Sequence, residues 1–243
     1  MRECGMLLPV ASLPSRYGIG AFSKEAYDFI DTLKAAGQSC WQILPLGPTG
    51  FGDSPYQSFS AFAGNPYFID LEKLTEEGLL TREECLDMDF GSDERDIDYK
   101  KIYDGRFPLL RKAYERWKEG RTPELVHELA GRKLGDETRE YCFYMAVKSH
   151  FDSCSWNLWD EGIRLRKPEA LEAYRAMLTD EIGFYEFQQI KFEEQWKALK
   201  GYAHEQGIRI IGDIPIYVAF DSADSWSRPE LFQFDENNMP GAV

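Results

Sequence analysis

Three short apolar runs with very unequal spacing constrain the fold of this chain most strongly. The first two, Gly5 to Ala11 and Trp41 to Leu44, lie close together, whereas the third, Ile208 to Val218, follows only after a long charged region. Apolar runs of this length, bounded by turn formers, predict buried strands. The first two runs enclose one helical pattern and so predict a βαβ unit, whose parallel strands are buried on both faces.

The segment between the first two runs predicts that helix. Ser23 is placed as its N-cap and Gly37 is placed to end it. Between them, apolar residues recur on one helical face: Ala26, Phe29, Ile30, Leu33 and Ala36.

The charged region from about Leu74 to Gln206 predicts several helices inserted between the second and third strands. Thr122 followed by Pro123 predicts the start of one helix. Another helix is predicted because apolar side chains at positions 192, 196, 199 and 203 share one helical face, and Gly207 is placed to end it.

Two parts of this insertion carry further expectations. The acidic stretch from Asp87 to Asp98 predicts a solvated loop. Helical spacing predicts a core position for Trp196. Trp156 and Trp159 lie in a break between helices, where they could be core residues or platforms for a ligand.

The third run places Asp213 near the carboxyl end of its predicted strand, and the tail from Phe220 to Val243 predicts a loop without a helix or a fourth strand. Three parallel strands joined by helical crossovers indicate an α/β barrel or an open doubly wound sheet. Both folds bind ligands at the carboxyl ends of their strands. An aspartate after glycine at a strand end can equally cap a turn.

The loop after the second strand, Pro45 to Leu71, combines turn formers with aromatic side chains and contains no basic residue. It is too rich in Gly and Pro for a helix and too rich in aromatic residues for a solvated linker. Aromatic faces beside small polar groups suit a ligand that has apolar faces and many hydroxyls. Tyr56, between Pro55 and Gln57, either belongs to such a site or serves packing alone.

The segment from Gly47 to Ser54 has the glycine and serine spacing of a phosphate-binding loop, but two residues exclude that function. Asp53 stands where such a loop needs lysine to neutralise phosphate, and Pro55 follows where a helix must begin. We therefore exclude nucleotide binding here. The other role of Asp53 is an Asx-type turn that holds Ser54 and Pro55.

Composition excludes several further classes of function. A formal net charge of −14 argues against binding of nucleic acid or an anionic membrane. The five cysteines lack CxxC spacing and predict reduced thiols, and the three histidines lack partners at metal-ligand spacing. No GxSxG motif is present. The first residues make a poor signal peptide, so we expect a soluble cytoplasmic protein without metal or cofactor.

Four stretches together resemble the 4-α-glucanotransferases (amylomaltases, or disproportionating enzymes) of glycoside hydrolase family 77. Leu44 to Leu71 is similar to the family signature, and Ser12 to Gly20, Ala36 to Pro45 and Gly207 to Trp226 agree in order. The resemblance implies the N-terminal part of a (β/α)8 barrel of the TIM type. About three parallel strands are expected, with a large helical insertion between the second and third.

The resemblance also implies a reaction, namely transfer of α-1,4-glucan segments between maltooligosaccharides or starch chains. In such retaining enzymes an aspartate nucleophile and a glutamate acid/base lie roughly 5–5.5 Å apart. A glucan hydroxyl, not water, then accepts the glycosyl group, while a third aspartate stabilises the distorted sugar.

Six positions of this sequence match binding positions of the family. Tyr56 is implied to pack on the donor sugar nearest the scissile bond, with Ser54 and Gln57 beside it, and Asp213 is implied to contact the same sugar. A second glucan site of some members matches Phe51 and Tyr103. Phe51 lacks the hydroxyl group of the tyrosine that those members have.

The catalytic carboxylates belong to family motifs beyond the third strand, so none is expected before Val243. A barrel needs about 250 residues even without large insertions. We expect the first two barrel units in residues 1–73, the insertion in 74–206 and the third strand in 207–243. The unclosed strand edge favours self-association, and the isolated chain is expected to be inactive. The alternatives are a non-catalytic glucan-binding module and a hydrolase of the α-amylase type.

Overall fold

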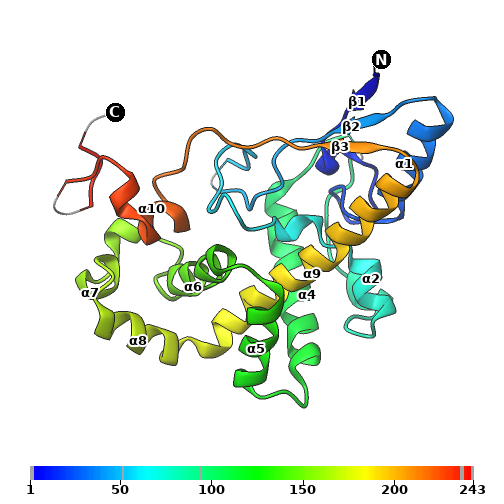
Figure 1. Ribbon diagram of the computed structural model, residues 1–243. Helices are drawn as coiled ribbons and strands as arrows, with labels where there is room; N and C mark the ends of the chain where they lie inside the picture. Colours follow the sequence, from blue (N-terminus) through cyan, green and yellow to red (C-terminus); the bar gives the residue numbers. More distant parts are fainter. Residues whose placement is uncertain (1–2, 51, 94, 236–237, 242–243) are drawn as a thin grey trace. The chain divides into compact units, whose positions relative to one another are not determined.

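The computed structural model describes residues 3–50, 52–93, 95–235 and 238–241, and the chain forms two compact units (Figure 1). Unit 1 comprises Met1–Leu46, Asn65–Gly120 and Lys191–Ile214, and unit 2 comprises Gly47–Gly64, Arg121–Ile190 and Pro215–Val243. The boundaries expected at residues 73 and 206 separate the barrel units from the helical insertion. The boundaries of the two compact units differ from these, because the inserted helices contribute to both units.

Unit 1 contains the sheet and the helices around it. Its elements are β1 (Gly5–Leu7), η1 (Val10–Ser12), α1 (Lys24–Ala35), β2 (Cys40–Gln42), η2 (Pro66–Phe68), α2 (Leu71–Glu76), α3 (Arg82–Leu86), α4 (Tyr99–Lys118) and β3 (Arg209–Ile211). Unit 2 contains α5 (Pro123–Lys133), α6 (Asp136–His150), η3 (Trp156–Leu158), α7 (Glu161–Arg164), α8 (Pro168–Met177), α10 (Ala223–Ser227) and η4 (Pro229–Leu231). The long helix α9 (Thr179–Glu205) begins in unit 2 and ends in unit 1.

The sheet has three parallel strands in the order β1-β2-β3, with Met6, Trp41 and Ile210 in register (Figure 1). Trp41 is fully buried, its ring centroid lies 5.1 Å from that of Phe29 in α1, and its Nε1 donates to the Leu8 carbonyl oxygen at 2.8 Å. Three parallel strands with a large helical insertion after the second are therefore confirmed.

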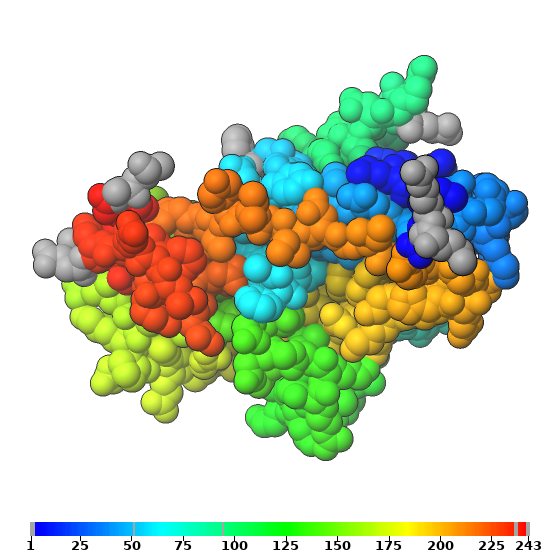
Figure 2. Space-filling view, turned by 45° about the horizontal axis from the view of Figure 1, so that its top comes forward, coloured from blue at the N-terminus to red at the C-terminus, as the bar shows by residue number. Residues whose placement is uncertain are grey.

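The prediction that these strands are buried on both faces is wrong. β1 is exposed throughout, and on the sheet face that Leu7 and Ile211 share these side chains are 54% and 45% exposed. Among the described residues no strand pairs with the outer edges of β1 and β3. Figure 2 shows β1, in dark blue, at the surface.

Two strands are also shorter than predicted. β3 ends at Ile211, and Ile214 and Ile216 beyond it are 76% and 85% exposed. β1 ends before Pro9, which has no N–H to donate to a sheet, and η1 follows it. Apolar content alone therefore overestimated the length of both strands.

The helix predicted between the first two strands is confirmed as α1. It starts directly after Ser23 and ends before Gly37, whose φ of +69° is readily adopted only by glycine. The Ser23 hydroxyl donates to Glu25 at 2.6 Å instead of capping the helix. Preceding α1, the fully buried Phe22 packs on Phe192 and Trp196 of α9 with ring centroids 5.2 and 5.4 Å away, so Trp196 serves packing as predicted.

Other boundaries of the insertion also follow the sequence. The Thr122 hydroxyl accepts from the Leu125 N–H at 3.3 Å, which confirms the predicted start of α5. The described residues of the acidic loop 87–98 are mostly exposed, as predicted. At its end, Asp98 caps α4 by accepting from the Lys101 N–H at 3.1 Å.

The prediction of a tail without a helix is wrong, because α10 lies within it. The Ser222 hydroxyl caps this helix by accepting from the Ser225 N–H at 3.2 Å. Trp226 is 1% exposed and donates from Nε1 to the Ile163 carbonyl oxygen at 3.1 Å. Figure 2 shows this red segment against the yellow-green one. A helix of five residues is too short to show a periodic pattern in the sequence.

Candidate functional site

The loop after β2 forms a hairpin in unit 2 that brings three of the predicted site residues together. Thr49 and Ser58 form an antiparallel bridge, and the Phe59 N–H donates to the Pro48 carbonyl oxygen at 3.0 Å. Gly47 lies so close to this bridge that an added Cβ would stand 2.6 Å from the Ser58 hydroxyl. A side chain at position 47 would therefore crowd Ser58, and glycine lets the two sides of the hairpin approach closely.

The tip of the hairpin carries Ser54, Tyr56 and Gln57. The Tyr56 N–H donates to the Ser54 hydroxyl at 3.3 Å, and the Gln57 N–H donates to the Ser54 carbonyl oxygen at 3.0 Å. The Tyr56 side chain is 45% exposed, whereas Ser58 and Ser60 at the base are buried. The hairpin thus presents an aromatic ring and polar groups from a tip whose base is buried.

Asp53 shapes the same tip. Its φ is +53°, and its carboxylate accepts a hydrogen bond from the Thr49 hydroxyl at 3.4 Å. Partial burial raises the pKa of this carboxyl, although that hydrogen bond opposes the shift. Residues 52–64 contain no helix, so neither the charge nor the backbone here suits a phosphate.

Two hydrogen bonds attach the base of the hairpin to the segment around α10. The Ala223 N–H donates to the Phe59 carbonyl oxygen at 2.8 Å, and the Ala61 N–H donates to Oδ2 of Asp224, also at 2.8 Å. Burial raises the pKa of Asp224, whereas the hydrogen bond from Ala61 lowers it. A buried side-chain amide holds the far end of the hairpin, because Gln189 of α9 both donates to and accepts from the Gly64 backbone, at 2.9 and 2.8 Å.

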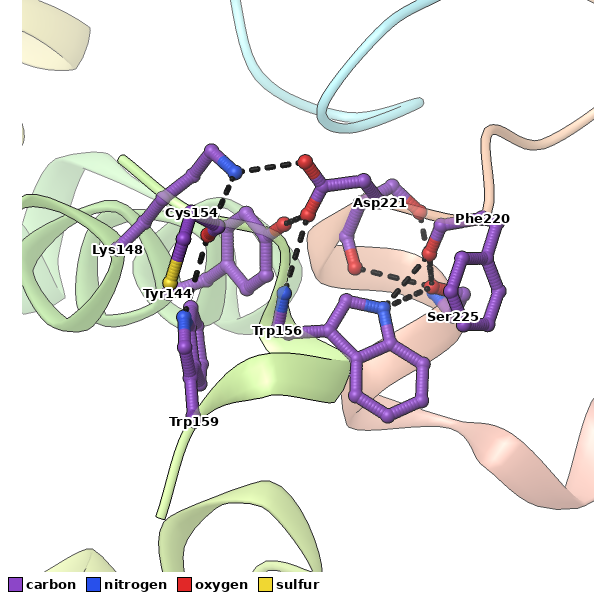
Figure 3. A network of polar contacts seen from close by, with 9 residues as sticks. Tyr144, Lys148, Cys154, Trp156, Trp159, Phe220, Asp221 and Ser225 are labelled. Carbon is purple, nitrogen blue, oxygen red and sulfur yellow. Dashed lines mark hydrogen bonds and ion pairs between the residues drawn. The ribbon is translucent and has the colours of Figure 1, made fainter. Parts of the chain in front are cut away.

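A polar cluster joins α6 to the segment before α10 (Figure 3). Lys148 and Tyr144 of α6 both bind the Asp221 carboxylate, at 2.6 Å each. Burial raises the pKa of the Tyr144 hydroxyl well above its ordinary value, and the nearby Asp221 charge adds to the shift. Trp156 donates from Nε1 to the Phe220 carbonyl oxygen at 2.7 Å. The cluster fixes the chain on both sides of residue 221.

The two tryptophans that the sequence left open are core residues. Trp156 and Trp159 are 0% and 3% exposed, and the Trp159 ring lies 5.4 Å from that of Trp226. Neither ring presents a face to a ligand.

The remaining predicted site residues lie in unit 1 or outside the described residues. Asp213 follows β3 by two residues, and its Oδ1 accepts the N–H of the adjacent Ile214 at 2.9 Å. Tyr103 of α4 is 53% exposed, with its ring centroid 4.7 Å from that of Phe107. Phe51 lies outside the described residues. Because the hairpin belongs to unit 2, a shared sugar site of Tyr56 and Asp213 stays a prediction.

A second candidate is a charged cavity of about 580 Å³ in unit 2. It is lined by His127, Asp136, Arg139, Glu140, Arg175, Ala176, Thr179, Ile182 and Glu186. Glu186 is 2% exposed and binds Nδ1 of His127 at 2.5 Å, which raises the pKa of that histidine. Glu140 pairs with Arg175 at 2.8 Å. Within the cavity wall His127 thus pairs with Glu186, and Glu140 pairs with Arg175. This pairing favours a structural role of the cavity over ligand binding.

The polar residues that support the hairpin escaped the sequence-based prediction. Lys148 could have been noticed, because it follows Tyr141 and Tyr144 at helical spacing on a face that is otherwise apolar. A lysine at such a position indicates a buried ion pair. Asp221 and Asp224 stand in a tail interpreted as a loop, and nothing local marks Gln189.

Two other kinds of site are absent from the described residues. No group of three or more His, Cys, Asp or Glu side chains among them could hold a metal ion. No helix among them is long and apolar enough to cross a membrane.

Comparison with known proteins gives one consistent family. The sequence profile of glycoside hydrolase family 77, described as 4-alpha-glucanotransferase, matches residues 8–243. A 4-alpha-glucanotransferase of Streptococcus pneumoniae is 47% identical over 243 residues, covering 100% of this chain and 48% of the relative. The Thermus thermophilus 4-alpha-glucanotransferase is 44% identical over 244 residues, with the same two coverages.

A solved structure, the amylomaltase from Streptococcus agalactiae in complex with acarbose, superposes with a TM-score of 0.94 at 42% identity. The superposed region covers 100% of this chain and 49% of the amylomaltase chain. The chain therefore spans about half the length of the relatives it matches. From the matched residues and the superposed fold, we conclude that the chain belongs to the 4-alpha-glucanotransferase family.

Proposed function

We propose that this chain supplies one wall of the donor-sugar site of an enzyme that transfers α-1,4-glucan segments. The substrates would be maltooligosaccharides or starch chains, and the mechanism a retaining double displacement. Family membership supports this proposal, as does the related amylomaltase that was solved with acarbose.

The observation that carries the proposal is the exposed Tyr56 ring on a hairpin with a buried base. A sugar ring has an apolar face that can pack on tyrosine and hydroxyls that need hydrogen bonds. Ser54 and Gln57 lie beside Tyr56 and supply donors and acceptors.

Two further positions complete the proposed binding surface. The Asp213 carboxylate, oriented by the Ile214 N–H, would accept hydrogen bonds from hydroxyls of the same donor sugar. Tyr103, which is 53% exposed, would contribute to a second glucan site together with Phe51. Both roles rest on the match to family positions.

We further propose that the polypeptide of these 243 residues binds glucan but does not turn it over. None of the residues assigned to the wall is a nucleophile or an acid/base. Retaining transfer needs both of those carboxyl groups at the scissile bond.

Calorimetric titration with maltoheptaose tests the binding role. Tyr56→Ala should weaken the affinity about tenfold or more, because burial of an aromatic face contributes about 1.5–3 kcal/mol. Tyr56→Phe should retain most of the affinity. Phe62→Ala is the matched control, since Phe62 is a 59% exposed aromatic residue of the same loop.

Two results would contradict the proposal. Equal affinities of wild type and Tyr56→Ala would remove the sugar-binding role of the hairpin. Sustained disproportionation of maltotriose by the purified chain would overturn its inactivity.

A further inference from the structure

We propose that the ion pair of the buried Lys148 and the 33% exposed Asp221 is a positioning device for the Tyr56 hairpin. The effect of this ion pair on sugar affinity rests on the function proposed above. Its effect on the position of the hairpin does not depend on that function.

Lys148 is an ion-paired lysine inside the protein. Its side chain is 5% exposed, and its Nζ donates to Oδ2 of Asp221 at 2.6 Å and to the Cys154 carbonyl oxygen at 3.0 Å (Figure 3). Removal of a charged side chain from water is unfavourable unless a well-placed partner and further hydrogen bonds offset it. The pair is therefore a weak source of stability, but it restricts where the carboxylate can lie.

The second oxygen of Asp221 is also held. Oδ1 accepts from the Tyr144 hydroxyl at 2.6 Å and from the Trp156 N–H at 3.4 Å. With fixed partners on both oxygens, the carboxylate has a single orientation. Residue 221 is thereby anchored to α6 and to the start of η3.

The anchor reaches the hairpin within three residues. Ala223 and Asp224, two and three residues after Asp221, bond Phe59 and Ala61 through the two 2.8 Å contacts at the base of the hairpin. Lys148 adds a direct contact, with its Nζ 5.2 Å from the Phe59 ring centroid, within cation–π range.

The position of Tyr56 depends on that base. Tyr56 precedes Phe59 by three residues, and the Phe59 N–H closes the hairpin on the Pro48 carbonyl oxygen. A shift of the segment from 221 to 224 would move the base and carry the exposed tip with it. We infer that the ion pair sets the geometry in which Tyr56 is presented.

The test separates geometry from stability. Asp221→Asn leaves the 5% exposed Lys148 ammonium uncompensated, and Lys148→Met leaves the 33% exposed Asp221 carboxylate without its cation. Both should lower thermal stability, the first more than the second. The double variant Lys148→Met/Asp221→Asn has no buried charge and should recover most of the stability. It also lacks the ionic attraction that fixes the side chain at position 221, so the hairpin should remain misplaced.

Two measurements follow the hairpin in all variants. Amide hydrogen exchange at Ala61 reports its base without any ligand, and maltoheptaose affinity reports its tip. For the double variant we expect exchange about tenfold faster and affinity about tenfold weaker than wild type, each corresponding to about 1.4 kcal/mol. Lys148→Arg, which keeps the charge but changes its reach, should stay stable and still lower the affinity.

Lys191→Met is the matched control. Lys191 is 8% exposed and pairs with Glu77 at 2.7 Å, but it belongs to unit 1. This change should lower stability without altering exchange at Ala61 or the affinity.

The outcomes are distinguishable. A double variant with wild-type exchange at Ala61 would overturn the positioning role, and so would a Lys191→Met variant with equally fast exchange. If the wild-type chain binds no maltoheptaose, the proposed function fails, while exchange at Ala61 still decides the role of the ion pair.

Discussion

Replacement of Gln189 by alanine should destabilise the chain more than most single substitutions. Gln189 is 2% exposed, and its side-chain amide makes two hydrogen bonds with the Gly64 backbone, at 2.8 and 2.9 Å. The same device recurs in unit 1, where Gln195 accepts from the Asp70 N–H at 2.7 Å and donates to its carbonyl oxygen at 3.3 Å. Each glutamine thus replaces a missing backbone partner.

The magnitude follows from the groups left behind. Gln189→Ala would leave the Gly64 N–H and carbonyl without these partners in a buried environment. Each orphaned group costs about 1–3 kcal/mol, so the expected loss is about 2–6 kcal/mol. In a chain of this size that loss lowers Tm by roughly 5–20 °C.

Urea unfolding followed by circular dichroism measures this loss. Gln189→Met refills the volume without the hydrogen bonds and should recover only the packing part. Gln206→Ala is the matched control, because Gln206 accepts an exposed hydrogen bond from Lys34 at 2.6 Å and should cost less than about 0.5 kcal/mol. A loss below about 1 kcal/mol for Gln189→Ala would refute the reasoning.

Two further predictions concern charge and the open sheet. The pKa of His127 is raised, chiefly by its hydrogen bond to Glu186, so its stabilisation is full below 6.5 and fades as pH rises through the raised value. Urea unfolding from pH 6 to 9 should show this loss in wild type, and a parallel profile for His127→Gln would contradict it. The exposed apolar face should let two copies associate. In sedimentation velocity, Leu7→Lys or Ile211→Lys should reduce dimer, whereas Leu158→Lys, at a 70% exposed position, should not.

The sequence predicted the order of elements well because local signals mark them. Ser23 and Gly37 delimit α1, and Thr122 with Pro123 starts α5. It failed on the extent and burial of the strands: Ile214, predicted to lie within the third strand, follows the end of β3 and is 76% exposed. It missed α10, whose cap Ser222 precedes only five helical residues.

The tip of the candidate site was predictable and its support was not. Ser54, Tyr56 and Gln57 form one contiguous motif, and the structure places them on one hairpin. Lys148 and Asp221, which support that hairpin, are separated by 73 residues and meet only through the fold. No local pattern encodes a contact of that kind.

The contrast between tip and support has a physical reason. A sugar gains affinity from a ring and hydroxyl partners that already stand in place, because ordering them on binding would cost about 0.5–1.5 kcal/mol per side chain. Tyr56 is 45% exposed, and under the proposed function this exposed part of the ring would meet the ligand. The hairpin backbone is ordered by the Asp224 carboxylate at Ala61 and by the Gln189 amide at Gly64, which bond it directly. Polar side chains suit this task better than apolar ones, since a hydrogen bond fixes direction as well as distance.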